Sequence, residues 1–161
     1  MEVRKLTENE HFEANMISYV AFHMRMEDPE KAREESRKLT TDDWAAFDED
    51  GKMMARILNY SFQSRLDGQW AVSGGIGAVS TLPEYRNSGA IRAIFEKLIP
   101  DAYRKGEVFS TLYPFSHAFY RKFGYETACW RNDYEFEPSV LSGSRLDGTA
   151  ELWKPGDPVS G

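Results

Sequence analysis

The stretch that decides the fold is AVSGGIGAVSTLPEYRNSGAIRAIF, residues 71–95. Residues 71–81 are mostly small or β-branched and predict a strand. Residues 82–85 interrupt that strand, and residues 86–89 form a short polar loop that ends in glycine. From Ala90 onward apolar residues recur every three or four positions, which predicts a helix. The stretch therefore has the order strand, loop, helix.

The start of a helix behind a glycine-containing loop is a favourable place for an anion. The first backbone N–H groups of a helix have no partner within it, and the helix dipole adds about half a positive charge there. Gly89 lacks a Cβ, so a ligand can approach the backbone, and Arg86 adds a permanent cation. The loop thus indicates a phosphate-binding site. An ordinary β–α turn with an N-cap at Asn87 or Ser88 explains the same residues equally well.

Two motifs carry a resemblance to a known family. Residues 79–89, VSTLPEYRNSG, resemble the acetyl-CoA motif of the GNAT N-acetyltransferases, in which Arg/Gln-x-x-Gly-x-Gly/Ala joins a strand to a helix. Residues 116–126, SHAFYRKFGYE, are similar to the family's second signature, a short helix that carries a tyrosine and ends in glycine and an aromatic residue. The last position of the first motif is Ile91 rather than glycine or alanine. The enhanced-intracellular-survival-type acetyltransferases tolerate that departure, and the chain most resembles their N-terminal catalytic domain.

The resemblance implies an α/β fold: a mixed, mostly antiparallel, twisted sheet flanked by helices, with a splayed acetyl-CoA cleft. Acetyl-CoA would be the acetyl donor, with its pantetheine arm paired to the strand end and its thioester oxygen bound by a backbone N–H there. The residues that the resemblance assigns to donor binding are Val79, Ser80, Thr81, Arg86, Asn87, Ser88, Gly89, Ala90 and Ile91. The predicted general acid for the leaving thiolate is Tyr120, at the family's tyrosine position. A packed tyrosine whose hydroxyl caps a helix end is the alternative for that residue.

The sequence offers no clear base for the amine. Residues 71–81 contain neither a carboxylate nor a histidine. Glu84 is nearest in sequence but is expected to face solvent beside the loop, and His117 is more typical of a surface or satisfied histidine. Ser116 beside His117 could suggest a hydrolase, but no Gly-x-Ser-x-Gly elbow surrounds that serine.

The acceptor predicted from the resemblance is a primary amine of a small molecule or a protein, acetylated by direct attack in a ternary complex. Phe22 and Trp44 are candidate contacts for that acceptor, although packing explains each of them better. A domain that holds coenzyme A without turnover, degenerate or truncated and with an assembly role, is the alternative function. A homo-oligomer is compatible with the resembled branch.

The rest of the chain continues the alternation of strands and helices. The strands expected from the pattern are residues 2–6, 44–48, 52–64, 69–81, 108–113 and 134–136. The helices expected are residues 7–24, 28–39, 87–105 and 115–123. Three glycines inside one strand, Gly74, Gly75 and Gly77, suggest a bulge or a close approach of another group. We expect an acetyltransferase domain over residues 1–137 and a linker or tail over residues 138–161, where a further domain of the resembled branch would begin.

Composition limits the classes of partner. The net charge of −6 and the pI of about 5.2 disfavour nucleic acid, which needs a basic face. A single cysteine, Cys129, excludes an internal disulfide and a cysteine metal cluster, and no other spacing indicates a metal site. No apolar run reaches ~18 residues, so the sequence predicts neither a signal peptide nor a membrane span. We expect a cytoplasmic protein.

Overall fold

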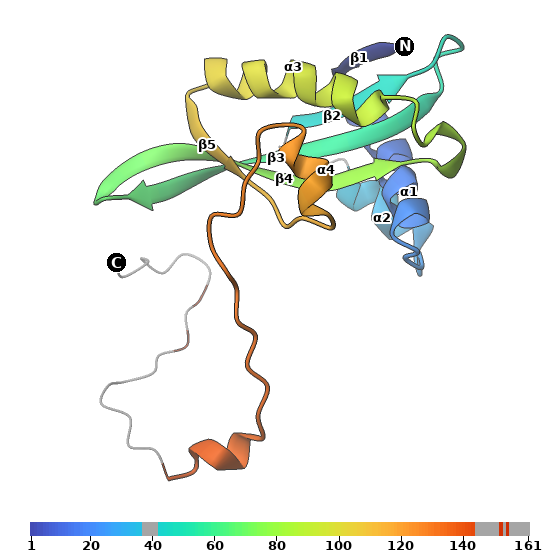
Figure 1. Ribbon diagram of the computed structural model, residues 1–161. Coiled ribbons are helices and arrows are strands. Elements are labelled where there is room, and N and C mark those ends of the chain that lie inside the picture. Colours follow the sequence, from blue (N-terminus) through green and yellow to red (C-terminus); the bar gives the residue numbers. More distant parts are fainter. Residues whose placement is uncertain (37–41, 144–151, 153, 155–161) are drawn as a thin grey trace. The chain divides into compact units, whose positions relative to one another are not determined.

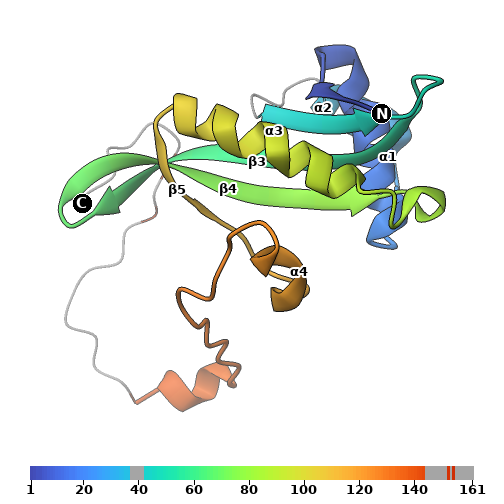
Figure 2. The same cartoon turned by 45° about the horizontal axis from the view of Figure 1, so that its top comes forward.

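The computed structural model describes residues 1–36, 42–143, 152 and 154 (Figure 1). The chain divides into two compact units, Met1–Thr127 and Ala128–Gly161, and each is described here by itself. The first unit is a five-stranded sheet in the order β1-β2-β3-β4-β5, with helices on both faces (Figure 2). Neighbouring strands are antiparallel except for the last pair, β4 and β5, which are parallel.

The strands of the sheet are β1 (Glu2–Lys5), β2 (Asp42–Phe47), β3 (Met53–Leu66), β4 (Gln69–Thr81) and β5 (Glu107–Thr111). The α-helices are α1 (His11–Ala21), α2 (Pro29–Ser36), α3 (Ala90–Arg104) and α4 (His117–Arg121). The 3₁₀ turns among the described residues are η1 (Glu8–Glu10), η2 (Pro83–Tyr85) and η3 (Pro138–Leu141). None of the helices in the described part of the chain is long and apolar enough to cross a membrane.

Local chemistry explains where these elements begin and turn. The two expected capping-box residues meet at the start of η1: Glu10 Oε2 accepts from the Thr7 N–H at 2.8 Å and from the Thr7 hydroxyl at 2.7 Å, while the Glu10 N–H donates to the Thr7 carbonyl at 3.0 Å. Asp28 caps α2 by accepting from the first two N–H groups of that helix at 3.0 Å each. Between β3 and β4, Asp67 and Gly68 both have positive φ, as a two-residue hairpin of type I′ requires.

The structure differs from the sequence-based expectation at the ends of several elements and in one expected strand. Helix α3 begins at Ala90 rather than residue 87, and it continues through Pro100 to Arg104. Helix α2 is described from Pro29 to Ser36, and residues 37–39 of the expected helix lie outside the described residues. The strand expected at residues 134–136 is wrong, since residues 125–137 have no regular structure. A strand needs a partner edge as well as an alternating pattern, and Tyr134 and Phe136 are exposed.

The face of the sheet covered by α3, the α3 face, carries an apolar core. Its fully buried members include Ile57 from β3 together with Ile94, Phe95 and Leu98 from α3. Trp44 belongs to the same core and is 8% exposed. Trp44 was a candidate acceptor contact; the structure assigns it to packing, because even positions of β2 face α3.

The opposite face, covered by α1 and α2, is the α1 face. It has a smaller apolar cluster of Ala14, Ile17, Ala45, Phe47 and Met53. Buried polar side chains accompany that cluster, and the largest of them are Arg56, Asp43 and His11. The two faces of one sheet are therefore buried by different kinds of side chain.

The glycines of β4 are explained by side chains of neighbouring strands. A Cβ at Gly75 would lie 2.5 Å from the Phe62 ring, and one at Gly77 would lie 3.1 Å from the Tyr60 ring. A Cβ at Gly74 would collide with the Glu107 carboxylate. The close approach expected from the sequence is therefore made by this chain's own side chains, at least along this part of the strand.

Candidate functional site

The edge of β4 is open over its second half. The parallel pairing with β5 ends at Gly75 and Thr111, whereas β4 continues to Thr81 and stays paired with β3 on its other side. Within the described part of the chain, no strand pairs with the outer edge of residues 76–81. The backbone N–H and C=O groups of this edge are available to an extended ligand, in the manner of an added strand.

A bulge interrupts β4 in the same segment. The register with β3 passes from Arg56 opposite Ser80 to Leu58 opposite Gly77, so that Ala78 and Val79 together face one residue of β3. Ala78 has φ of +48°, a left-handed conformation that costs a residue with a Cβ about 1–2 kcal/mol. Such a conformation persists only where surrounding contacts hold it.

The loop before α3 has free N–H groups at its end. Asn87 and Gly89 have φ of +65° and +84°, and the first helical hydrogen bond runs from the Ala93 N–H to the Gly89 carbonyl at 3.0 Å. The Ala90 N–H is weakly bonded to Ser88 Oγ at 3.3 Å. Across the described residues, no acceptor is bonded to the N–H groups of Gly89, Ile91 and Arg92. A Cβ at Gly89 would have no neighbour within 4 Å.

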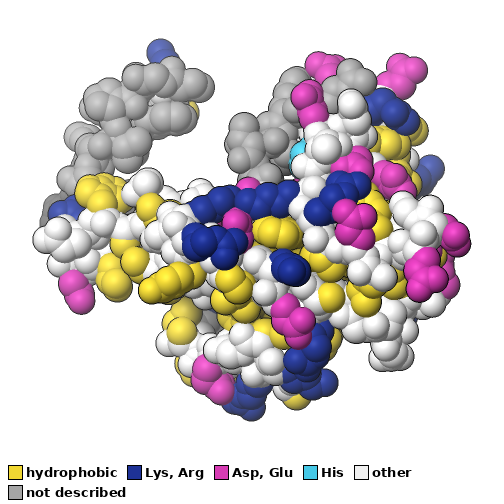
Figure 3. Space-filling model, turned by 90° about the horizontal axis from the view of Figure 1, so that it is seen from above, with side chains coloured by type: hydrophobic (Ala, Val, Ile, Leu, Met, Phe, Trp, Pro, Cys, Tyr) yellow, Lys and Arg dark blue, Asp and Glu magenta, His cyan; other side chains and the backbone are white. Residues whose placement is uncertain are grey.

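These groups fit a phosphate ester. Unpaired N–H groups at the start of a 15-residue helix, an open approach over Gly89 and the exposed guanidinium of Arg86 provide the donors and the positive charge that a diphosphate prefers. Figure 3, which views the molecule from above, shows Lys and Arg side chains interspersed with Asp and Glu on the side that carries α3. Arg92 and Lys97 are exposed basic residues of α3.

The loop is braced from a turn that the sequence did not implicate. The Tyr85 hydroxyl donates to Asp48 Oδ2 at 2.6 Å, and Lys52 lies over the Tyr85 ring, 5.2 Å from its centroid. Lys52 also pairs with Glu84 at 3.2 Å, which ties that exposed carboxylate to the β2–β3 turn. These contacts join residues far apart in the sequence, so no local motif could have indicated them.

Ile91 packs inward. Its side chain lies against the core cluster that contains Ala90, Ile94 and Tyr120, and the side chain of Val79 packs against the same cluster. The departure from glycine or alanine at this motif position therefore fills the core. Ser80 is buried in β4, while Thr81 at the strand end is partly buried.

Tyr120 is 4% exposed and lies in that cluster. Its ring is 5.2 Å from Phe119 and 6.2 Å from Tyr125, between ring centroids. Burial raises the pKa of the Tyr120 hydroxyl above its ordinary value, and the neighbouring Tyr125 raises it further. No described residue is hydrogen-bonded to this hydroxyl, whereas the Tyr125 hydroxyl is bonded to Ser110 Oγ at 2.8 Å.

The other candidates have simple structural roles. Ser116 is the N-cap of α4, since its Oγ accepts from the Phe119 N–H at 3.3 Å, and His117 is exposed at the first position of that helix. Phe22 is half exposed at the C-terminal end of α1. The described residues contain no cluster of three or more side chains suited to a metal ion.

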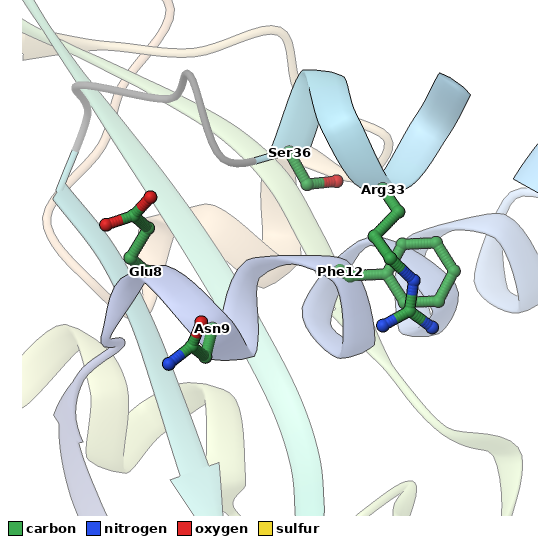
Figure 4. A pocket seen from close by; sticks show the side chains of 5 residues that line it. All are labelled: Glu8, Asn9, Phe12, Arg33 and Ser36. Atoms are coloured by element: carbon green, nitrogen blue, oxygen red, sulfur yellow. The ribbon is translucent and has the colours of Figure 1, made fainter. Parts of the chain in front are cut away.

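A separate pocket lies between η1 and α1 on one side and α2 on the other (Figure 4). It is lined by Glu8, Asn9, Phe12, Arg33 and Ser36. The Arg33 guanidinium lies over the Phe12 ring, 4.2 Å from its centroid. None of the residues predicted for donor or acceptor binding lines this pocket.

Solved structures with the same fold include several acetyltransferases. A conserved protein from Enterococcus faecalis V583, described as a probable N-acyltransferase, is 31% identical with a TM-score of 0.71 over 78% of this chain and 32% of its own. Eis1 from Mycobacterium abscessus is 22% identical with a TM-score of 0.65, over 78% of this chain and 31% of its own. Glucosamine-6-phosphate N-acetyltransferase from Arabidopsis thaliana is 16% identical with a TM-score of 0.68, over 84% of this chain and 98% of its own. The chain thus spans about a third of the length of the first two proteins.

The family comparison covers nearly the whole first unit. No curated protein matches the chain. The family model described as an acetyltransferase (GNAT) domain matches residues 2–128, which include the open edge of β4, the Gly89 loop and Tyr120. The chain therefore belongs to the GNAT acetyltransferase family.

Proposed function

We propose that the chain binds acetyl-CoA along the open edge of β4 and at the start of α3, and transfers its acetyl group to a primary amine by direct attack in a ternary complex. One observation carries the proposal: β4 continues to Thr81 after its pairing with β5 has ended at Gly75, and the same strand leads into the loop with free N–H groups. A linear ligand with a diphosphate at one end and amide groups along its length matches that order of features.

The donor residues have distinct tasks in this proposal. The N–H groups of Gly89, Ile91 and Arg92 bind the diphosphate, and the Arg86 guanidinium offsets its charge. The free edge of residues 79–81 pairs with the amide groups of the pantetheine arm. A backbone N–H of the same edge donates to the thioester oxygen, where negative charge develops during attack.

Tyr120 supports the leaving group as a hydrogen-bond donor. Its raised pKa keeps the hydroxyl protonated at physiological pH. A free thiol has a pKa of about 8.5, so complete proton transfer from the tyrosine to the thiolate is uphill. Donation of a hydrogen bond to the sulfur lowers the barrier without that transfer.

The acceptor is an amine that arrives neutral or loses its proton to water. Glu84 is bonded to Lys52, and His117 is exposed, so neither is held in position as a base. The neighbours differ in their acceptors: one is described as an aminoglycoside acetyltransferase from a soil metagenomic sample, and another acts on glucosamine-6-phosphate. Binding of coenzyme A without turnover is the second candidate, because neither Glu84 nor His117 is held in position as a base.

The first test is thermal unfolding with and without acetyl-CoA. A ligand at a hundred times its Kd stabilises the folded state by about 2.7 kcal/mol, which for a chain of this size raises Tm by roughly 5–10 °C. No rise at millimolar acetyl-CoA would reject the proposal. A rise without release of free thiol across a panel of amines would favour the second candidate.

Gly89→Val tests the phosphate loop. The side chain would occupy the open space over the N–H groups, so acetyl-CoA should no longer raise Tm. Gly106→Val is the matched control, because Gly106 has φ of +82° against +84° for Gly89 and also has no neighbour within 4 Å. Both variants carry the same backbone strain, so equal loss of binding in both would reject the loop assignment.

Tyr120→Phe tests the leaving-group role. The variant keeps the ring contacts with Phe119 and Tyr125, so acetyl-CoA affinity should stay within about twofold while kcat falls by roughly 10²-fold or more. Equal loss of affinity and kcat would make Tyr120 a packing residue.

A further inference from the structure

The buried polar side chains of the α1 face form one connected network. Arg56 and Asp43 are each 2% exposed and form a two-pronged ion pair, with Arg56 Nε 3.1 Å from Asp43 Oδ1 and Nη2 2.5 Å from Oδ2. His11 Nδ1 lies 3.1 Å from the same Oδ2. The ion pair is thus fixed to β2, β3 and the start of α1.

A second arm of the network leads to β4. Arg56 Nη1 donates to Asn15 Oδ1 at 2.5 Å and lies 3.5 Å from Ser18 Oγ, both on α1. Ser18 Oγ lies 3.1 Å from Ser80 Oγ on β4. Ser80 Oγ in turn lies 3.0 Å from the carbonyl oxygen of Ala78, the left-handed residue of the bulge.

The donor and the acceptor of each hydrogen bond follow from the two groups at which the network begins and ends. Arg56 can only donate, so Ser18 Oγ accepts from it. The Ala78 carbonyl can only accept, so the Ser80 hydroxyl donates its single proton there. Ser80 Oγ must then accept from the Ser18 hydroxyl. Each hydroxyl has one donor role and one acceptor role, and the network ends on the backbone of the bulge.

We propose that this network holds the bulge of β4, and that Ser18, Ser80 and Arg56 are positioning residues for the donor-binding edge. The inference rests on the proposed function. Arg56 and Ser80 are the last regularly paired residues before the bulge. The ion pair of Arg56 therefore fixes β3 beside the bulge, and the Ser80 hydroxyl fixes the bulge backbone on β4. The left-handed Ala78 sets the direction in which the following N–H groups point. Loss of the network would therefore tilt residues 79–81 while leaving the loop before α3 unchanged.

A second pair of serines in the same chain serves as a control for the proposed network. Ser64 Oγ and Ser73 Oγ lie 2.6 Å apart, and Ser73 is a β4 residue that is 3% exposed, as Ser80 is. This second serine pair joins β4 to a neighbouring element on the same face. It lies outside the network and in the half of β4 that is paired with β5.

The test measures the two ends of the donor site separately, by calorimetric titration of the full chain. Acetyl-CoA probes the whole site, and adenosine 3′,5′-bisphosphate probes the nucleotide end without the pantetheine arm. Ser18→Ala and Ser80→Ala should raise the Kd of acetyl-CoA about fivefold, the factor that corresponds to one net hydrogen bond, with the Kd of the bisphosphate unchanged. Ser64→Ala should change neither.

Hydrogen exchange of the ligand-free chain gives a second readout. Ser18→Ala, which alters no atom of β4, should speed the exchange of the amides of residues 79–81, and Ser64→Ala should not. Equal effects of Ser18→Ala and Ser64→Ala on these amides and on acetyl-CoA affinity would overturn the inference. So would a parallel loss of bisphosphate affinity. A wild-type chain that binds neither ligand would instead overturn the proposed function, and the inference with it.

Discussion

The two faces of the sheet are buried by different kinds of side chain. Under α3 the core is aliphatic and aromatic, with Ile94 and Phe95 fully buried. Under α1 the largest fully buried side chain is Arg56, paired with Asp43. Apolar contacts are non-directional, so they stabilise buried side chains without requiring one particular geometry. Hydrogen bonds and ion pairs require specific distances and angles, so a polar face fixes the position of the strands that carry it.

The comparison indicates which face contributes mainly to stability and which face fixes the geometry of β4. The α3 face is buried by many interchangeable apolar contacts, and Tyr120 and Ile91 pack in the same cluster. The α1 face ties β4 beside its bulge to α1 through the Ser18–Ser80 hydrogen bond, and ties β3 to β2 through the two-pronged Arg56–Asp43 ion pair. Substitutions on the two faces should therefore differ in the size of the stability loss and also in whether they change the geometry of the bulge.

The largest expected effect is that of Arg56→Met. It leaves the buried Asp43 carboxylate without its cationic partner, which typically costs roughly 3–5 kcal/mol of unfolding free energy. Chemical denaturation measures that loss. The double variant Arg56→Met with Asp43→Leu is the control, because removal of both charges should recover most of the stability. A double variant as unstable as the single one would show that packing, not charge, dominates this face.

Ile94→Val should have a smaller effect, on the opposite face. Removal of one methylene group from a fully buried position costs about 1 kcal/mol. Because the apolar core does not fix the bulge, acetyl-CoA affinity should stay within about twofold of wild type after correction for the fraction folded. A several-fold change in affinity would contradict the division of roles between the faces.

The smallest effect concerns an ion pair on the rim of the α1 face. Arg4 Nη2 lies 2.6 Å from Glu10 Oε1, and this hydrogen bond, with those from Thr7, lowers the pKa of Glu10 from 4.5 to about 2. A lowered folded-state pKa means that the stabilisation is present above about pH 4.5 and is lost as the pH falls towards 2. The Arg4 side chain is 37% exposed, so solvent screening keeps the contribution small.

Glu10→Gln should lower Tm slightly at pH 7 and flatten its fall between pH 4.5 and 2. Tm measured across that range tests this. Glu8→Gln, which neutralises another carboxylate of the same turn, is the control. An unchanged acid profile in Glu10→Gln would show that the ion pair contributes nothing measurable, in contrast to the buried pair at Arg56.

The elements that were predicted correctly depend on neighbours in the sequence. The hairpin at Asp67 and Gly68 forms because both residues tolerate positive φ, and α3 forms because its apolar residues lie on one side. A sequence motif predicts the loop at Gly89, because the feature that it encodes, exposed N–H groups at the start of a helix, depends only on neighbouring residues. The roles assigned to donor-binding residues and to Tyr120 remain predictions.

What the sequence could not supply depends on distant contacts. Trp44 was a candidate acceptor contact until the register of β2 placed it under α3. The pattern at Tyr134 and Phe136 predicts a strand that lacks a partner edge. The bulge falls on Ala78 and not on one of the nearby glycines, because the Ser80 hydroxyl and the network behind it support a conformation that alanine avoids alone.

The sequence by itself determined the order of strands and helices up to residue 123, the hairpin turns and the strand–loop–helix order of residues 71–95, because backbone propensity and hydrophobic period act over a few residues. Only the tertiary structure decided that β4 separates from β5 after Gly75, and that Arg56, Ser18 and Ser80 meet behind the bulge. Those facts depend on register and on hydrogen bonds between residues distant in the chain. No local pattern encodes them, since each is satisfied only once β2, β3, β4 and α1 are packed together.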